Sequence, residues 1–66
     1  MRESQIKAMA YKAMQDAQAA GKSEADIIHD AAVVFYKYDR RVSYPKNATP
    51  RARALYDKHF AVKEPN

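Results

Sequence analysis

The sequence predicts an all-α fold, a small three-helix bundle built on an N-terminal antiparallel αα-hairpin. Apolar residues recur at helical spacing in three segments, a lone glycine separates the first two segments, and a Thr-Pro pair precedes the third. A chain of 66 residues allows one domain, so residues 1–66 are expected to form a single helical unit.

The first helix is expected over residues 4–20. At about 100° per residue, one face of this helix collects small and apolar side chains. These are Ile6, Met9, Ala10, Ala13, Met14, Ala17 and Ala20. Because alanine is small, another helix can approach this face closely. A homodimer that packs through the Ala-rich face is a further hypothesis.

The connection between the first two helices carries the clearest local signals. Gly21 is the only glycine in the chain, and it follows the first apolar run directly, as expected for a left-handed residue that ends a helix. Ser23 can then cap the amide of Asp26 at the start of the next helix. So short a connection predicts an antiparallel hairpin.

The second helix is expected over residues 24–42. Its predicted core stripe consists of Ile27, Ile28, Ala31, Val34, Phe35, Tyr38 and Val42. Arg40 and Arg41 would lie in its last turn, where cations complement the helix dipole. Residues 43–48 are then expected to form a loop.

The third helix is expected over residues 50–62. Thr49 would be its cap and Pro50 its first residue, a position that needs no amide donor. Its predicted buried residues are Ala52, Leu55, Tyr56, His59 and Phe60. Residues 63–66 are expected to be a frayed tail.

The composition argues for a thin core and against catalysis. Leu, Ile, Val and Phe total 10 of 66 residues, and thirteen alanines supplement them. The chain has no cysteine, and one glycine cannot make a phosphate-binding loop. Asp26, His29 and Asp30 share neighbouring turns, but acids are common at the start of a helix for electrostatic reasons. We therefore expect no enzyme activity, metal or cofactor, and with neither a signal peptide nor a membrane span we expect a cytoplasmic location.

A second line of residues runs along the predicted second helix, opposite its core stripe. It consists of His29, Val33, Tyr36 and Arg40, at spacings of four, three and four. Either the third helix covers this line, or the line is an exposed aromatic and basic strip of the kind found where partners bind. The sequence favours the first explanation, since a central helix is commonly buried on two sides.

The basic stretch at residues 40–53 is the main candidate for a functional site. It contains five cations and no acid, and residues 31–66 together carry a net charge of +5. Arginine and tyrosine are enriched at interface hot spots. The predicted partner-binding residues are Tyr36, Lys37, Arg40, Arg41, Tyr44, Lys46, Arg51 and Arg53, with His29 and Val33 as a secondary strip.

The favoured function is a small non-enzymatic protein that docks on an acidic surface of a larger protein, as an inhibitor or regulator. Short single-domain binders without cysteine are often encoded by phages or mobile elements, so size alone suggests such an origin. The alternative is a DNA-associated regulator, in which Arg51 and Arg53 and the amides that follow Pro50 would hold a phosphate. A structural subunit that assembles by helix packing is a third hypothesis.

Overall fold

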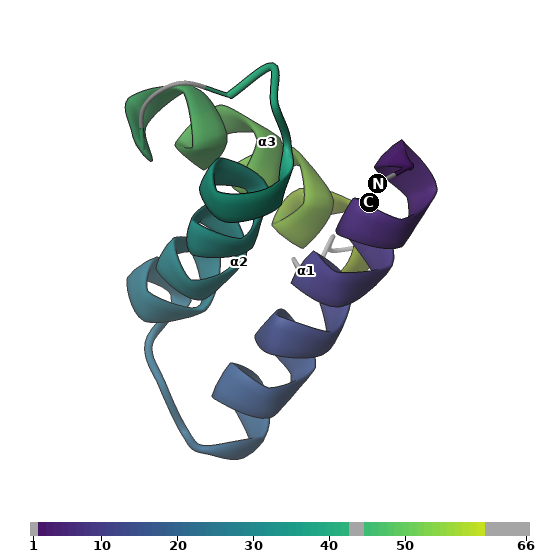
Figure 1. The fold of residues 1–66 in the computed structure, drawn as a ribbon. Coiled ribbons are helices and arrows are strands. Elements are labelled where there is room, and N and C mark those ends of the chain that lie inside the picture. Colours follow the sequence, from purple (N-terminus) through teal and green to yellow (C-terminus); the bar gives the residue numbers. More distant parts are fainter. Residues whose placement is uncertain (1, 43–44, 61–66) are drawn as a thin grey trace, which may run out of the picture.

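The computed structural model describes residues 2–42 and 45–60, which form three helices (Figure 1). Helix α1 spans Glu3–Ala19, α2 spans Glu24–Tyr38 and α3 spans Pro45–His59. No strand occurs in these described residues, and the all-α prediction is confirmed. The predicted tail at residues 63–66 lies outside them.

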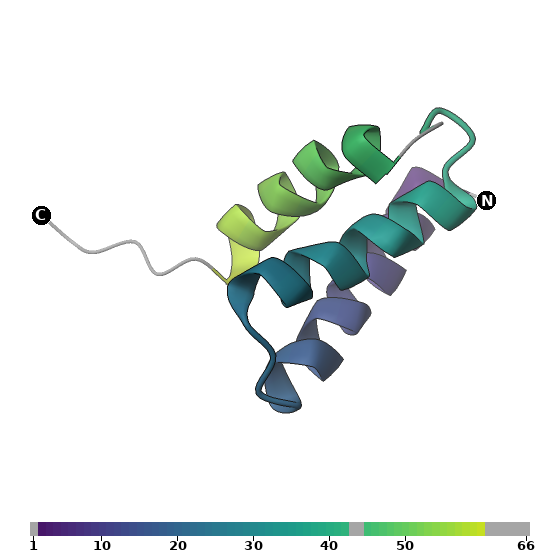
Figure 2. The same ribbon diagram turned by 90° about the vertical axis from the view of Figure 1, so that its left-hand side faces the viewer.

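Helix α2 is the central element. It packs along both α1 and α3, whereas α1 and α3 contact each other only slightly. Figure 2 shows α3 running back beside α2, with α1 inclined to both. Over the described ranges, none of the helices combines the length and the apolar character that a membrane crossing requires.

The hairpin between α1 and α2 forms as the sequence predicts. Gly21 has a φ of 79°, and the amide of Lys22 donates to the carbonyl of Ala17 at 3.1 Å, which is the hydrogen bond of a glycine-ended helix. The hydroxyl of Ser23 accepts from the amide of Asp26 at 3.3 Å and caps α2. Local chemistry therefore determines this connection.

Helix α2 ends at Tyr38, four residues before the predicted end at Val42. Asp39 leaves the helical conformation, with φ −94° and ψ 114°, and its carboxylate accepts a hydrogen bond from the amide of Arg41 at 2.9 Å. An aspartate that bonds to the backbone two residues ahead favours a turn over a helix. Val42 is nevertheless buried, because the turn carries it back onto the core.

Helix α3 begins at Pro45, so the predicted start at Pro50 is wrong, and residues 45–48 of the predicted loop are helical; residues 43 and 44 lie outside the described ranges. Both prolines fit the first position of a helix by local criteria. Packing distinguishes them, since Ala48 and Ala52 are both completely buried and lie one helical turn apart. Thr49 lies inside the helix instead of capping it.

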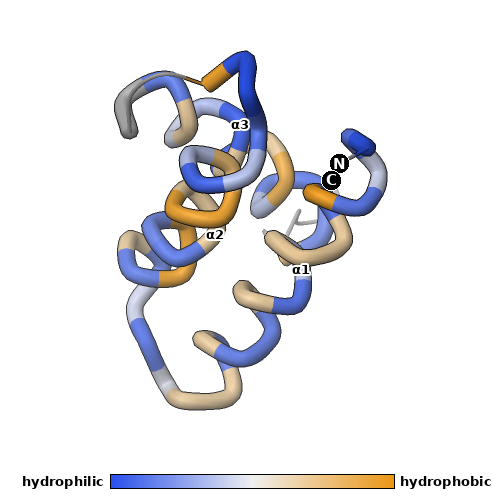
Figure 3. The backbone as a smooth tube through the Cα atoms, viewed as in Figure 1, coloured by the Kyte–Doolittle hydropathy of each residue, from blue (hydrophilic) through white to orange (hydrophobic). Residues whose placement is uncertain are grey.

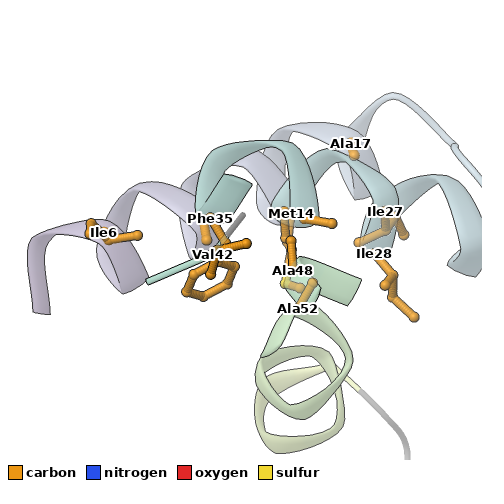
Figure 4. Close-up of a cluster of buried hydrophobic side chains, with 12 residues drawn as sticks. Ile6, Met14, Ala17, Ile27, Ile28, Phe35, Val42, Ala48 and Ala52 are labelled. Atoms are coloured by element: carbon orange, nitrogen blue, oxygen red, sulfur yellow. The ribbon is translucent and has the colours of Figure 1, made fainter. Parts of the chain in front are cut away.

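The core is thin and rich in alanine. Among the described residues, half of the buried apolar side chains are alanine, and Met14 is the largest side chain that is fully buried. Figure 4 shows Met14 near the middle of the cluster, between Phe35 and Ile28. Small side chains let the helices approach closely, which raises the number of dispersion contacts that a short chain can make.

Some individual core predictions are wrong. Ala20, Tyr38 and His59 are exposed, whereas Ala32 and Ala48 are buried although the predicted stripes omit them. The Ala-rich face of α1 contributes four of its seven residues to the core of the single chain: Ile6, Ala10, Met14 and Ala17. The other three residues of this face, Met9, Ala13 and Ala20, are not buried, and the homodimer stays a hypothesis.

The outer face of α2 is exposed, so the interpretation that α3 covers it is wrong. Val33 and Tyr36 remain 45% and 47% exposed. The buried residues of α2 form one continuous arc, because α1 and α3 occupy neighbouring sides of the helix and not opposite sides. Apolar residues are concentrated in α2 (Figure 3), and this helix has more of them than two neighbours can cover.

Substitution of Pro50 by alanine tests the start of α3. Alanine restores the amide that can donate to the carbonyl of residue 46 and removes the ring that disfavours a helix interior. We expect the free energy of unfolding to rise by about 1 to 2 kcal/mol, after allowing for the larger entropy of the unfolded chain. Urea denaturation followed by circular dichroism measures the change.

Pro45→Ala is the matched control. At the first helical position no amide donor is needed, so alanine adds no hydrogen bond there. The free energy of unfolding should fall by less than about 1 kcal/mol, because the unfolded chain gains entropy when proline is replaced. Destabilisation by Pro50→Ala would show instead that α3 begins at Pro50.

Candidate functional site

A buried carboxylate next to the basic stretch pairs with arginines of that stretch. Asp39 directly precedes the stretch and is only 6% exposed. One of its oxygens accepts from the backbone amide and Nε of Arg41 at 2.9 and 3.2 Å, and the other accepts from Nη2 at 3.1 Å. This two-oxygen arrangement is the strong, directional form of an arginine–carboxylate pair.

The pair extends to the other two helices. Nη2 of Arg41 lies 3.3 Å from Oε1 of Glu3 in α1, and Nη1 of Arg51 in α3 lies 4.0 Å from Oδ2 of Asp39. Lys7 adds a contact of 3.7 Å to Glu3. A network of Asp39, Arg41, Glu3 and Arg51 therefore joins the turn after α2 to both neighbouring helices.

The network shifts the ionisation of its central groups. The hydrogen bonds from the Arg41 side chain and backbone lower the pKa of Asp39, and this effect outweighs the burial that opposes it. The hydrogen bonds to Asp39 and Glu3 raise the pKa of Arg41. Both groups are therefore charged at neutral pH.

The structure divides the predicted binding residues into groups with different surroundings. Arg41 and Arg51 have acidic partners within the fold, whereas Arg40 and Arg53 are exposed and form no ion pair within residues 2–42 and 45–60. Tyr44 lies outside the described residues. Only the backbone of Lys46 is described, and it lies in the first turn of α3.

The predicted phosphate site at the start of a helix is wrong. Because α3 begins at Pro45, Arg51 and Arg53 lie in its second and third turns, away from the amides that begin the helix. Asp39 also places a negative charge beside Arg51. These residues therefore lack the arrangement that would combine helix amides and guanidinium groups around one phosphate.

The outer face of α2 presents the secondary strip to solvent. The side chain of His29 is 74% exposed, and Val33 and Tyr36 continue the same face. Arg40 is exposed but follows the end of α2, so helical spacing alone does not align it with the others. Lys37 lies at the border of the face, with its Nζ 5.4 Å from the ring centre of Tyr38.

Asp30, next to His29, has a structural partner, and Asp26 lies in the capped first turn of α2. Lys22 donates to Asp30 at 2.9 Å, which raises the pKa of Lys22 and links the hairpin connection to α2. No group of three or more potential metal ligands occurs among the described residues. The arrangement of Asp26, His29 and Asp30 thus has a local explanation in capping and ion pairing.

Sequence reasoning missed two features of the surface. One is Asp39, which a search for a purely basic stretch leaves out, although an acid directly before two arginines is a signal for pairing. The other is a groove between α1 and α3 with Phe35 in its lining. No sequence pattern indicates this groove, because it depends on the angle between helices that hardly touch.

Comparison of the chain with protein-family models, with curated proteins and with solved structures gives no significant match.

The acid dependence of stability tests the network. Since the folded protein lowers the pKa of Asp39, the unfolded chain binds the proton more readily. The contribution of Asp39 is complete above the ordinary carboxyl pKa of about 4 and is lost as the pH falls through the lower folded value. We expect Asp39→Asn to be less stable at pH 7 and to lose less stability on acidification. Urea midpoints measured from neutral to acidic pH check this.

Asp57→Asn is the control for that series. Asp57 is exposed in α3 and has no ion pair within the described ranges, so this variant makes the same chemical change outside the network. An Asp39→Asn variant with the same acid dependence as Asp57→Asn would contradict the role of the network.

Proposed function

We propose that this chain is a small non-enzymatic binding protein that docks on an acidic surface of a larger protein and inhibits or regulates it. The observation that carries the proposal is the half-exposed pair Val33 and Tyr36 on the uncovered face of α2. Lys37 follows Tyr36 on α2 and Arg40 lies in the turn after the helix, so both add positive charge to this end of α2. Neither apolar side chain has a role in the core that would explain its place.

The chemistry of this face suits a protein partner. Tyrosine and arginine are enriched among residues that dominate binding energy, and burial of a large side chain contributes about 1.5 to 3 kcal/mol. A standard interface takes about 800 Å² from each partner. That is roughly a sixth of the 4947 Å² accessible surface of this chain, so neighbouring exposed residues such as Tyr38 would join the contact.

The charge of the chain indicates which partners fit. The net charge is +4, and the excess lies in the second half of the sequence. Arg40 and Arg53 are available to an external anion, since neither has an ion pair in the described part of the chain. Complementary charge speeds association and selects against basic partners.

Nucleic acid is the competing target for the same cations. The pairing of Arg41 and Arg51 with Asp39 reduces the number of cations available to consecutive phosphates. Titration with random duplex DNA at rising salt separates the two functions, because several phosphate contacts would give a steep loss of affinity with salt. A protein-binding surface predicts weak DNA binding without that steep dependence.

Capture of partners with matched variants tests the proposal. The tagged wild type, Tyr36→Ala/Arg40→Ala and Gln15→Ala/Gln18→Ala are compared in lysate of the cells that contain the chain. The last variant changes exposed residues on α1. We expect at least one acidic protein to bind the wild type and this control equally, and to bind the α2 variant about tenfold or more weakly.

Isothermal titration of the purified pair then measures the affinities directly. If every captured protein bound the α2 variant as tightly as the wild type, the outer face of α2 would not be the docking surface.

A further inference from the structure

A groove of about 500 Å³ lies between α1 and α3, on a side of the molecule formed by different residues from the outer face of α2. It exists because both helices pack on α2 while hardly touching each other. Phe35, a buried residue of α2, contributes to its lining, and so does Leu55 of α3. The groove is thus built on a packed core and is already open.

Small side chains leave the groove open. Ala8 on α1 and Ala54 on α3 line it and are both exposed, so no larger side chain occupies the space between them. On each helix the lining residues recur at helical spacing and form one stripe per wall. Two helical walls of this kind match the ridges of a further helix.

Aromatic rings give one end of the groove a defined shape. The ring of Tyr11 lies 4.9 Å from that of His59 and 5.4 Å from that of Phe60, measured between ring centres. Tyr56 stacks on Phe60 at 5.8 Å. These contacts link α1 to the end of α3 and favour a preformed site.

The rim of the groove is positively charged. Lys7, Arg51 and Lys58 line it, against one acid, Glu3. Lys58 forms no salt bridge within the described residues. Lys7 meets Glu3 only at 3.7 Å with both side chains more than half exposed, a weak pairing that an incoming carboxylate can replace.

We propose that this groove binds an acidic amphipathic helix of a partner protein. Apolar side chains of that helix would pack against Ala8, Ala54 and Leu55, which lie over the buried Phe35. Its carboxylates would meet Lys7 and Lys58. A helix in this position completes a four-helix arrangement on α2 and covers apolar surface that the chain itself leaves open. A nucleic acid fits less well, because its polar backbone would lie against an apolar floor.

This inference goes beyond the proposed function and does not depend on it. The groove is formed by α1, α3 and the inner side of α2, whereas the proposed docking surface is the outer side of α2. The Tyr36→Ala/Arg40→Ala variant should therefore retain binding at the groove, so failure of one proposal leaves the other intact.

A designed peptide pair tests the groove. One fluorescent peptide of about four helical turns carries a leucine stripe flanked by glutamates, and its counterpart has lysine at every glutamate position. Fluorescence anisotropy with the full chain should show the acidic peptide binding at least about tenfold more tightly than the basic one, and more weakly as salt rises. Amide chemical shifts of the labelled chain should move at the residues that line the groove.

Two variants locate the binding. Ala54→Phe fills the groove at an exposed position without altering the charge. We expect this variant to bind the acidic peptide at least about tenfold more weakly. Lys58→Glu reverses one charge of the rim, and its effect should be several-fold and sensitive to salt. Lys12→Glu makes the same charge change on α1 outside the groove and should have little effect. Circular dichroism verifies that each variant is folded.

Several outcomes would overturn the proposal. They are equal binding of the two peptides, unchanged binding by Ala54→Phe, or no binding up to about 1 mM peptide. Binding that occurs only after removal of residues 61–66 would assign the groove to the end of this chain. A dimer in sedimentation that Ala54→Phe abolishes would assign it to a second copy.

Discussion

The pairing of the Asp39 carboxylate with Arg41 lies where α2 ends and where all three helices are linked. A nearly buried charge is tolerated only when it has partners, and Arg41 supplies three hydrogen bonds from its backbone and side chain. This pairing ends α2, turns the chain towards α3, and brings Arg41 to Glu3 in α1. In a chain with so few large apolar side chains, such a polar link specifies how the helices meet where hydrophobic packing is sparse.

The same pairing determines which parts of the surface remain for function. It places Arg41 and Arg51 beside a carboxylate inside the fold and leaves Arg40 and Arg53 exposed. The basic stretch is thus divided between structural and available cations. Exposed apolar surface lies elsewhere, on the outer face of α2 and in the groove between α1 and α3. Both surfaces arise because α1 and α3 each pack on α2 but contact each other only slightly.

The sequence predicts the parts of this fold that depend on neighbouring residues. The prediction of α1 agrees with the structure within one residue at each end, and Gly21 with Ser23 accounts for the hairpin. The start of α3 could not be predicted in the same way, because Pro45 and Pro50 satisfy the same local rule and only the burial of Ala48 separates them. Helical periodicity gives the faces of α2, but it does not tell which sides α1 and α3 occupy. For that reason the exposure of Tyr36 and the existence of the groove become visible only in three dimensions.

The most direct test of this account is the titration of the Asp39 carboxyl carbon by nuclear magnetic resonance, in the wild type and in Arg41→Ala. We expect the pKa of Asp39 to lie below its ordinary value of about 4 in the wild type and to rise when the Arg41 side chain is removed. A pKa at or above the ordinary value, unchanged by Arg41→Ala, would contradict the account, because Arg41 would then be as free to meet a partner as Arg40.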